Sequence, residues 1–480
     1  MEKLGFIADI MAKKNPHLNP ETFRDSLATV QEDGKRNWVY PKKVSGIFYK
    51  YRSYLSWVLL AILFAGPFIQ MNGRPYMLFN IFERRFIIFG AAFWPQDTYL
   101  LIFLLLIFFV FIILFTVVFG RIFCGWFCPQ TLFMEMVFRK IEYLIEGDAN
   151  QQRQLNEGPW TGEKFVKKGI KLTIFAVISL LIGHLVMAYL VGVDQVKTIV
   201  SQPPSANMAG FIGLIAFSGI FMFVFSWFRE QACLVVCPYG RLQGVLLDNN
   251  SINVMYDYVR GEPRSPIRKN QAILEPKGDC IECSLCVQVC PTGIDIRNGI
   301  QMECVNCTAC IDACDEVMVK VDRPKGLIRY ASENSIKQGF QKLITGRVKG
   351  YIVVLCILIA AFVTLIATRD DIKATITRFP GMTYQEREDG KVTNLYQITL
   401  INKTFESQKV ELKSLVDGIE VELLGNQELI LDAQSKFEGR FFLVRNQDEV
   451  KVNQEKVKLS VIYQGEELDK IETNFTAPIN

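Results

Sequence analysis

The sequence is poor in histidine, with two residues in 480. His17 lies in a polar N-terminal segment, which leaves His184 alone within the apolar part of the chain. A haem held inside the membrane by two histidines is therefore excluded. The sequence also has no GxGxxG fingerprint, no Walker A loop and no CxxCH motif, so a bound nucleotide or c-type haem is not supported.

An excess of charge of one sign is missing as well. The formal net charge is +4, and no long run of Lys and Arg with interleaved aromatic residues occurs. We therefore expect no nucleic-acid partner. The first fifty residues lack the apolar core and small-residue cleavage site of a secretory signal, so we expect the N-terminus to stay in the cytoplasm.

Apolar residues, in contrast, make up 50% of the chain and are gathered into blocks. A block that crosses about 30 Å of hydrocarbon must be a helix, because only a helix satisfies its own backbone hydrogen bonds in lipid. Five blocks are long enough, at residues 54–70, 99–119, 172–193, 208–228 and 350–368. The sequence thus predicts an α-helical transmembrane bundle of about five spans.

The distribution of Lys and Arg predicts the orientation of these spans. Both residues are concentrated at 35–52 and 121–168, and positively charged loops stay in the cytoplasm. Three arginines in the first outside loop are a partial exception: Arg74, Arg84 and Arg85. On balance we expect 229–349 to be cytoplasmic and 369–480 to lie outside, in the periplasm of a Gram-negative cell.

The predicted organisation is therefore a series of alternating segments. These are a cytoplasmic segment 1–53, a transmembrane hairpin 54–120, a cytoplasmic loop 121–171, a second hairpin 172–228, a cytoplasmic region 229–349 with a ferredoxin-like domain at about 273–325, a fifth span 350–368 and an outer domain 369–480.

The outer domain has no cysteine and shows apolar residues at every second position. The alternating positions are Tyr396, Ile398 and Leu400, and later Val457, Leu459, Val461 and Tyr463. Such alternation with Gly and Asp-Gly turns predicts a small β-sandwich. Because nothing in it clusters chemically, a structural or docking role is favoured over a catalytic one.

Twelve of the thirteen cysteines fall in regularly spaced groups, and eight of them lie within 35 residues. These eight form two runs of CxxCxxCxxxC: Cys280, Cys283, Cys286 and Cys290, then Cys304, Cys307, Cys310 and Cys314. The repeated run is typical of bacterial two-cluster ferredoxins, in which the fourth cysteine of each run ligates the other cluster. Zinc knuckles would explain pairs of cysteines but not the full repeat.

The predicted ligand sets are therefore crossed. Cys280, Cys283, Cys286 and Cys314 would hold one 4Fe-4S cluster, and Cys304, Cys307, Cys310 and Cys290 the second. Asp315 follows the last cysteine where the simplest pattern has proline, which removes no ligand. Basic residues upstream could receive an acidic electron donor, although a solvated surface is the commoner explanation: Arg264, Arg268, Lys269 and Lys277.

Two further cysteine pairs follow the second and fourth spans, each as CxxxCP. They are Cys124 with Cys128 and Cys233 with Cys237. We expect each pair to share a helix face, and the following proline to open the helix there. Four such thiols would suit Cu(I), another iron-sulfur centre or a redox dithiol, and packing as small apolar residues is the plain alternative.

Other soft or polar residues of the apolar part are weaker candidates. Met134, Met136 and Met222 would add thioether ligands only if they point inward. His184 is equally explained as a metal ligand or as a histidine bonded to a neighbouring helix. Cys356 in the last span is expected to pack rather than react.

With these motifs, the chain resembles the CcoG/FixG/RdxA family of cytochrome oxidase accessory proteins over nearly its whole length. Asn72-Gly-Arg-Pro75 and Phe93-Trp-Pro-Gln-Asp97 also resemble stretches typical of that family. The resemblance implies an immunoglobulin-like C-terminal domain in the periplasm and a location in the bacterial inner membrane. It further implies reduction of Cu(II) to Cu(I) for assembly of cbb3-type cytochrome c oxidase.

The implied partners are a copper ion, a cytoplasmic electron donor, and subunits or assembly factors of the oxidase. Copper would be reduced at or near Cys124, Cys128, Cys233 and Cys237. Two rival readings stay open: a quinol-oxidising electron-transfer subunit, and a metal-binding assembly scaffold without turnover.

Overall fold

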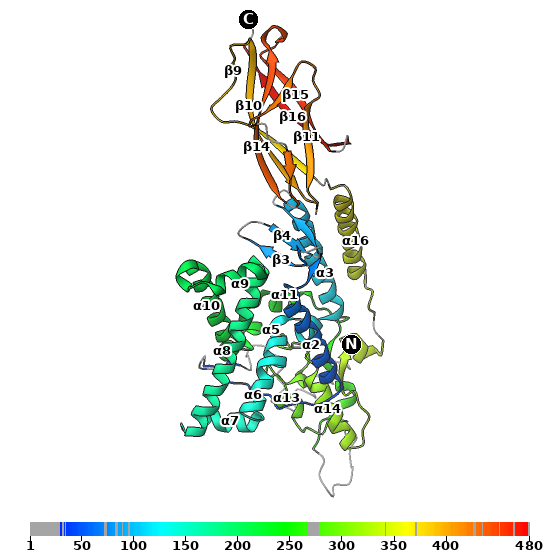
Figure 1. Ribbon diagram of the computed structural model, residues 1–480. Coiled ribbons are helices and arrows are strands. Elements are labelled where there is room, and N and C mark those ends of the chain that lie inside the picture. Colours follow the sequence, from blue (N-terminus) through cyan, green and yellow to red (C-terminus); the bar gives the residue numbers. More distant parts are fainter. Residues whose placement is uncertain are drawn as a thin grey trace. The chain divides into compact units, whose positions relative to one another are not determined.

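The computed structural model describes residues 29–478 apart from 31–32, 34, 72–73, 82–84, 89, 95–96, 267–277, 341, 370–371, 405, 426–428, 434, 451 and 464–465. The chain divides into two compact units (Figure 1). Unit 1 comprises Met1–Glu83 and Leu104–Ile359, and unit 2 comprises Arg84–Phe103 and Ala360–Asn480.

Four helices in the described part of the chain are long and apolar enough to cross a membrane. They are α3 (Thr98–Phe119), α8 (Gly162–Val191), α10 (Met208–Phe223) with the turns η3 (Pro204–Asn207) and η4 (Val224–Phe228) at its ends, and α16 (Gly346–Ala367). These match four of the five predicted spans. α8 and α10 lie side by side in Figure 1, and Gly183 lets them approach, because a Cβ there would come within 2.3 Å of Ser218 Oγ.

The predicted first span differs from the other four. Residues 54–70 overlap α2 (Ile47–Ala65), which begins earlier, ends earlier and carries Lys50 and Arg52 in its first two turns. Arg52 is buried and donates to the carbonyl of Gly125, so these first turns pack on protein. A fifth crossing stays a prediction, and the expectation that the two soluble parts lie on opposite faces depends on it.

An apolar cluster holds together α2, α8 and the π-helices η2 (Phe133–Phe138) and η4; α2 contributes Leu60, and the others contribute phenylalanines. The ring of Phe138 packs edge-on against Phe175 at 4.6 Å and stacks on Phe225 at 4.7 Å, and all three side chains are buried. Each such pair contributes about 0.5–1.5 kcal/mol beyond the apolar area that it buries. This cluster fixes the helices next to both CxxxCP pairs.

Short elements complete unit 1. They are α4 (Ile122–Trp126), α5 (Pro129–Leu132), α6 (Arg139–Ile145), α7 (Ala149–Glu157), α9 (Val193–Ser201), η5 (Ala232–Val236), α11 (Pro238–Leu246), α12 (Tyr258–Gly261), α13 (Leu285–Gln288), η6 (Ile296–Asn298), α14 (Ala309–Lys320), α15 (Glu333–Gln338) and the strands β1 (Gln70–Met71), β2 (Arg74–Pro75), β3 (Leu78–Asn80), β6 (Asn253–Tyr256) and β7 (Ile328–Ala331).

The ferredoxin-like part is built on the antiparallel pair β6 and β7. Its core contains Val254, Ile311, Met318 and Ile328 together with the eight regularly spaced cysteines except Cys283 and Cys307. Helix α14 also anchors α2, because the carboxylate of Asp312 accepts hydrogen bonds from the amides of Phe48 and Tyr49 at the start of that helix. The cysteine loops and α2 are thereby joined directly.

Unit 2 is a two-sheet β-sandwich, as predicted. One sheet has the order β12-β14-β10-β8 with β9 beside β10, and the other β13-β11-β15-β16. The strands are β8 (Ile372–Arg378), β9 (Gln385–Glu386), β10 (Lys391–Asn402), β11 (Gln408–Ser414), β12 (Glu420–Leu423), β13 (Leu429–Leu431), β14 (Lys436–Asn446), β15 (Gln454–Tyr463) and β16 (Glu466–Thr476), with β4 (Arg85–Ile88) and β5 (Ala91–Phe93) forming a separate hairpin and η7 (Gln447–Glu449) a short turn.

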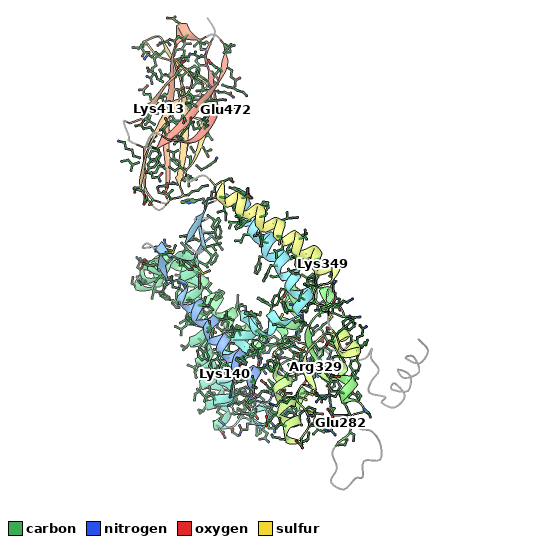
Figure 2. The ribbon with its side chains drawn as sticks, turned by 90° about the vertical axis from the view of Figure 1, so that its right-hand side faces the viewer. Lys140, Glu282, Arg329, Lys349, Lys413 and Glu472 are labelled. Atoms are coloured by element: carbon green, nitrogen blue, oxygen red, sulfur yellow. The ribbon has the colours of Figure 1, made fainter. Side chains whose placement is uncertain are left out.

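The alternating residues predicted for the sandwich core lie in it. Tyr396, Ile398 and Leu400 on β10 and Val457 and Leu459 on β15 are all fully buried. Between these positions, Gln397 and Thr399 on β10 are half-buried and uncharged, and Lys458 on β15 is exposed. Lys458 pairs with Glu472 of the neighbouring strand β16 at 3.4 Å; Glu472 and Lys413 of β11 are labelled on the sandwich in Figure 2. This arrangement follows from the period of two along a strand.

A buried carboxylate ties α3 to the sandwich within unit 2. Asp97, just before α3, is 1% exposed and forms ion pairs with Arg369 at 2.6 Å and Lys403 at 2.8 Å. Arg369 follows α16 and Lys403 follows β10. Because both cations converge on one carboxylate, Asp97 fixes the start of α3 against the chain that leads into the sandwich.

Candidate functional site

The eight cysteines of the repeated run line two separate cavities in unit 1. Cys280, Cys283, Cys286 and Cys314 line the first, beside Tyr256 and Met318. Cys290, Cys304, Cys307 and Cys310 line the second, beside Val254 and Thr308. The structure therefore brings together the two crossed sets that the spacing predicts, and each set fits a 4Fe-4S cluster in its four thiols. Cys286 also reaches the wall of the second cavity, so the two cavities are neighbours.

Burial sets the chemistry of these thiols. It raises the pKa of Cys286 to about 12, with Arg297 opposing the shift, and it raises the pKa of Cys304 to about 12 as well. Thiols in such an environment become thiolates when a bound metal centre compensates their charge. Cys283 differs from the others because it is exposed, which places the first cavity next to solvent.

Backbone conformation repeats between the two cysteine loops. Glu282 and Ser284 flank Cys283 with φ of 57° and 55°, and Asn306 and Thr308 flank Cys307 with φ of 51° and 66°. Residues other than glycine rarely adopt such angles, and strained backbone of this kind gathers at functional sites. The sequence gives no sign of it, because none of the four is glycine. The strain turns each loop around its cavity.

The two CxxxCP pairs share one local structure. Cys128 and Cys237 are extended, and each is followed by a proline that begins a short helix, α5 or α11. Their amides donate to the carbonyls of Phe123 and Ala232, five residues earlier in each case. The predicted opening at proline is present, but the expectation of one continuous α-helix face was wrong, because each pair spans a wide π-type turn. Such turns are frequent at functional sites.

The four thiols of these pairs lie near one another. Burial raises the pKa of Cys233 well above its ordinary value, and the thiols of Cys128, Cys124 and Cys237 raise it further. Burial likewise raises the pKa of Cys124 to about 11, against the opposing effect of Arg121. In the residues that the structure describes, no three His, Cys, Asp or Glu side chains are arranged to hold a single metal ion. A mononuclear site at the four thiols would therefore require them to move closer.

Arg121 joins the two pairs to the second cysteine cavity. Its buried guanidinium donates to Gln243 Oε1 at 2.5 Å and to the carbonyl of Gly240 at 2.6 Å, both on α11. It also donates to the carbonyl of Cys304 at 3.4 Å, while the Cys124 thiol donates to the same Gln243 oxygen at 3.4 Å. One cation thus contacts both hairpins and the cluster loop. Sequence reasoning treated it only as a basic loop residue.

Close backbone packing brings both pairs against this cavity. Gly125, inside the first pair, has no room for a side chain, because a Cβ would come within 2.5 Å of the carbonyl oxygen of Val305. Cys233, inside the second pair, lines a pocket with Val305, Pro291 and Thr292. Since Val305 and Pro291 belong to the loops of the second cavity, the four thiols lie beside the second cysteine set.

The remaining candidates have smaller roles. Met134 lines the pocket with Cys233, whereas Met136 accepts a hydrogen bond from Ser53 and Met222 lies on α10. His184 Nδ1 is 2.8 Å from the carbonyl of Leu180 on its own helix. Cys356 is exposed on α16. Of the basic residues proposed to receive a donor, Arg264 pairs with Glu262, and Arg268, Lys269 and Lys277 lie outside the described residues.

Comparison with known proteins decides the family. The chain is 33% identical to protein RdxA of Cereibacter sphaeroides over 407 residues, which is 80% of this chain and 83% of RdxA. It is 32% identical to protein RdxB of the same organism over 82% of this chain and 84% of RdxB. The chain belongs to the FixG/RdxA family. Nitrogen fixation protein FixG of Rhizobium meliloti is 35% identical over 62% of this chain and 58% of its own length.

Family models agree with the parts of this FixG/RdxA chain. Residues 228–333 match a 4Fe-4S dicluster domain, and residues 362–478 match the IG-like fold at the C-terminus of FixG, described as an oxidoreductase. Residues 101–145, which contain only the first CxxxCP pair among the cysteines, match a 4Fe-4S binding domain. A crystal structure of a FixG-related protein from Vibrio parahaemolyticus is 20% identical and covers 22% of this chain and 97% of its own, with a TM-score of 0.19.

Proposed function

We propose that this chain is a membrane-bound iron-sulfur oxidoreductase that reduces Cu(II) to Cu(I) for assembly of a cbb3-type cytochrome c oxidase. One observation supports it above the others: the four CxxxCP thiols lie beside the second of two four-cysteine cavities. Thiolates bind Cu(I) more tightly than Cu(II), so a copper ion held by these thiols would be stabilised in the reduced state when it receives an electron.

The chain's own residues would define the route. Cys280, Cys283, Cys286 and Cys314 would hold one cluster and Cys290, Cys304, Cys307 and Cys310 the other, and bound clusters would supply storage for one electron each. The exposed Cys283 marks the side at which a cytoplasmic donor could approach. Cys286, common to both cavities, and Arg121, which contacts Cys304, connect that side to the CxxxCP thiols.

Copper itself would be the substrate. Each Cu(II) takes one electron and leaves as Cu(I), and Cys124, Cys128, Cys233 and Cys237 would hold it during the transfer. In the orientation that the positive-inside rule favours, the clusters and thiols face the cytoplasm and the sandwich faces the periplasm. The sandwich would then contact subunits or assembly factors of the oxidase.

The test uses the purified full chain under anaerobic conditions. Its clusters are reduced with a chemical reductant that is then removed, Cu(II) is added, and the visible absorbance of the clusters is followed together with trapped Cu(I). We expect the clusters to reoxidise as Cu(I) appears, and Cys124→Ala and Cys233→Ala to prevent both. Clusters that stay reduced in the presence of Cu(II) would contradict the proposal and favour oxidation of quinol by the same chain.

A specific observation favours a second role for the four thiols. The model that matches residues 101–145 is a 4Fe-4S binding domain, although only Cys124 and Cys128 are available there as ligands. With Cys233 and Cys237 they would complete the ligand set of a third cluster. Iron content separates the alternatives: about eight irons per chain leave the thiols for copper, whereas about twelve irons, falling to eight in Cys124→Ala, indicate a third cluster.

A further inference from the structure

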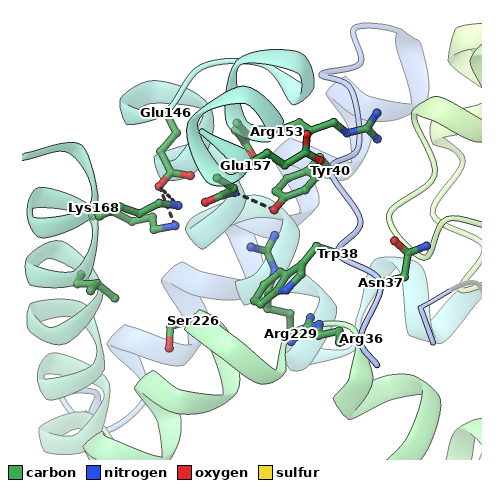
Figure 3. A pocket seen from close by; sticks show the side chains of 14 residues that line it. Arg36, Asn37, Trp38, Tyr40, Glu146, Arg153, Glu157, Lys168, Ser226 and Arg229 are labelled. Atoms are coloured by element: carbon green, nitrogen blue, oxygen red, sulfur yellow. Dashed lines mark hydrogen bonds and ion pairs between the residues drawn. The ribbon is translucent and has the colours of Figure 1, made fainter. Parts of the chain in front are cut away.

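A polar cavity of about 630 Å³ lies in unit 1, away from the cysteine cavities. Four parts of the chain enclose it: the N-terminal segment, the α6–α7 region, the first turns of α8 and the end of η4 (Figure 3). Its lining residues include Trp38, Tyr40, Leu172 and Ser226. The volume exceeds what a single ion needs, and neither the electron route nor the copper site uses this cavity.

Positive charge dominates the cavity wall. Five cations line it and two carboxylates face them: Arg36, Arg153, Lys168, Lys171 and Arg229, with Glu146 and Glu157. Glu142 and Glu230 stand behind the wall and pair with its arginines, so five cations still oppose four carboxylates. The cavity therefore carries one positive charge in excess.

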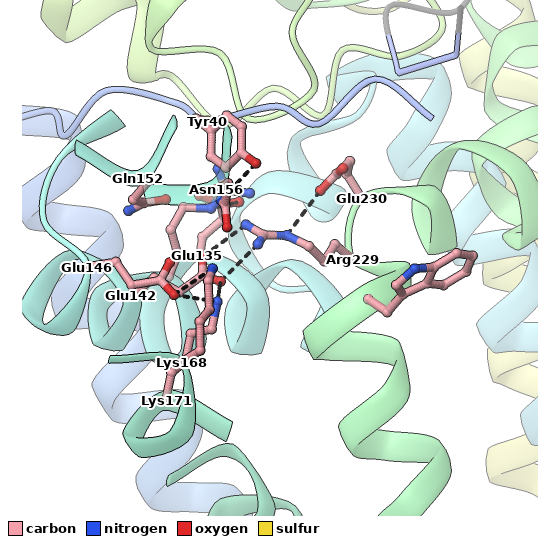
Figure 4. A network of polar contacts seen from close by, with 12 residues as sticks. Tyr40, Glu135, Glu142, Glu146, Gln152, Asn156, Lys168, Lys171, Arg229 and Glu230 are labelled. Carbon is pink, nitrogen blue, oxygen red and sulfur yellow. Dashed lines mark hydrogen bonds and ion pairs between the residues drawn. The ribbon is translucent and has the colours of Figure 1, made fainter. Parts of the chain in front are cut away.

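The buried part of this network is ordered by ion pairs (Figure 4). Arg229 is 4% exposed and donates to both carboxylate oxygens of Glu142, at 2.8 and 2.9 Å. Glu146 is 3% exposed, and its Oε1 forms ion pairs with the Nζ atoms of Lys168 and Lys171, each at 2.8 Å. These pairs hold the cationic groups at the wall in fixed positions.

Some donors of these cations nevertheless have no acceptor among the described residues. The buried Nε atoms of Arg36 and Arg229 make no hydrogen bond, and Glu230 Oε2 is 3.6 Å from Arg229 Nε, which is too long. Arg153 at the rim forms no ion pair within the described part of the chain. These two Nε atoms have almost no accessible surface, so they do not face the cavity. Arg153 is therefore the wall cation whose charge is available to an external acceptor.

We infer that this cavity binds a phosphate-bearing anion. Arginine and lysine side chains around a cavity recognise phosphate by charge-assisted hydrogen bonds. Leu172 on α8 and Ser226 on η4 belong to two of the candidate membrane spans. Basic pockets between transmembrane helices on the cytoplasmic side receive anionic lipid head groups. The phosphate could come from such a lipid or from solution.

The inference is tested by binding to the full chain, purified in neutral detergent and stripped of lipid. Phosphatidylglycerol, phosphatidylcholine and inorganic phosphate are titrated separately, with bound lipid counted by native mass spectrometry and thermal unfolding as a second readout. We expect saturable binding of phosphatidylglycerol that raises the unfolding midpoint. Arg153→Gln should weaken binding roughly tenfold, as expected for one lost charge-assisted hydrogen bond.

Matched variants separate the cavity from general charge. Arg153 is exposed and forms no ion pair with the described residues, so we expect its replacement to leave the fold intact. Lys168→Gln should also weaken binding. Lys167→Gln removes a neighbouring lysine of α8 that pairs with Glu163 outside the cavity, and it should bind like the wild type. If inorganic phosphate binds as tightly as phosphatidylglycerol and is lost in the same variants, the cavity is a phosphate site whose ligand comes from solution rather than from a lipid. Binding that is equal for phosphatidylcholine, unchanged in Arg153→Gln and Lys168→Gln, or absent for every probe would overturn the inference.

Discussion

Replacing Arg121 tests whether the CxxxCP thiols and the second cysteine cavity act as one electronic unit. Arg121→Gln removes the positive charge and the hydrogen bonds to Gly240 and Cys304, while Arg121→Lys keeps the charge but loses the planar fork. Both variants leave every cysteine in place. The pair of variants therefore separates the effect of charge from the effect of geometry.

The expected magnitudes follow from the contacts. A unit charge about 8 Å from a redox centre, at an effective dielectric of about 20, contributes about 2 kcal/mol, which is roughly 90 mV for one electron. Loss of the charge disfavours the reduced, more negative state, so Arg121→Gln should lower the reduction potential of one cluster. Losing the hydrogen bonds that this buried guanidinium makes to neutral acceptors also costs about 2–3 kcal/mol of unfolding free energy.

Potentiometric titration followed by electron paramagnetic resonance checks this prediction. In Arg121→Gln one cluster should become harder to reduce by roughly 50–100 mV, and the other should change much less, because Arg297 rather than Arg121 lines its cavity. In Arg121→Lys the reduction potential of that cluster should stay close to the wild-type value, because the charge is kept, whereas the unfolding free energy should still fall, because the planar fork is lost. Equal shifts of both clusters, or no shift in Arg121→Gln, would refute the placement of Arg121 beside the second cluster.

Three further predictions concern packing and charge. In a denaturation assay, Gly125→Ala should lower the unfolding free energy by about 1–3 kcal/mol, because the new Cβ meets the backbone oxygen of Val305. Gly169→Ala on α8 is the control: no atom lies within 4 Å of its Cβ position, so the change should be neutral or stabilising. Asp97→Asn removes the carboxylate that pairs with Arg369 and Lys403 and should lower the unfolding free energy by about 3–5 kcal/mol. The β-rich unit should then unfold at a lower temperature, and an unchanged unfolding temperature would argue against these ion pairs. Burial alone would raise the pKa of Glu142, but Arg229, Lys171 and Arg139 hold this pKa below its ordinary value of 4.5. The ionised carboxylate therefore stabilises the fold fully above pH 4.5, and this stabilisation is lost as the pH falls through the lower pKa of the folded protein. In Glu142→Gln the unfolding free energy, measured by denaturation at several pH values, should fall less steeply below pH 4.5.

Regular patterns in the sequence predicted a large part of the fold. The period of two on β10 and β15 placed Tyr396 and Leu459 in the sandwich core, because alternation along a strand is a local property. The regular spacing of the eight cysteines, which is typical of two-cluster ferredoxins, predicted the two groups of four that line the two cavities. The role of each cysteine as a cluster ligand stays a prediction. Four apolar blocks likewise match the four long helices.

Features that depend on contacts between distant residues were not predictable. Arg121 looked like a loop cation, and only folding brings it to Gly240 and Cys304, more than a hundred residues away. The left-handed conformations of Glu282 and Ser284 have no compositional signal, because neither residue type favours positive φ and the loop around the cavity imposes it. Helix α2 begins at Ile47, before the apolar block 54–70, because its charged first turns pack on protein through contacts that the sequence does not show. Whether residues 54–70 cross the membrane stays a prediction.

Counting electrons delivered to copper tests the central proposal most directly. The reduced full chain is mixed anaerobically with excess Cu(II), and Cu(I) is measured against the absorbance regained by the clusters. Two clusters that store one electron each predict about two Cu(I) per chain in the wild type, and little or none in a chain with both Cys124→Ala and Cys233→Ala whose clusters remain intact. Full Cu(I) yield in that double variant, or no reoxidation in the wild type, would contradict reduction of copper at the four CxxxCP thiols.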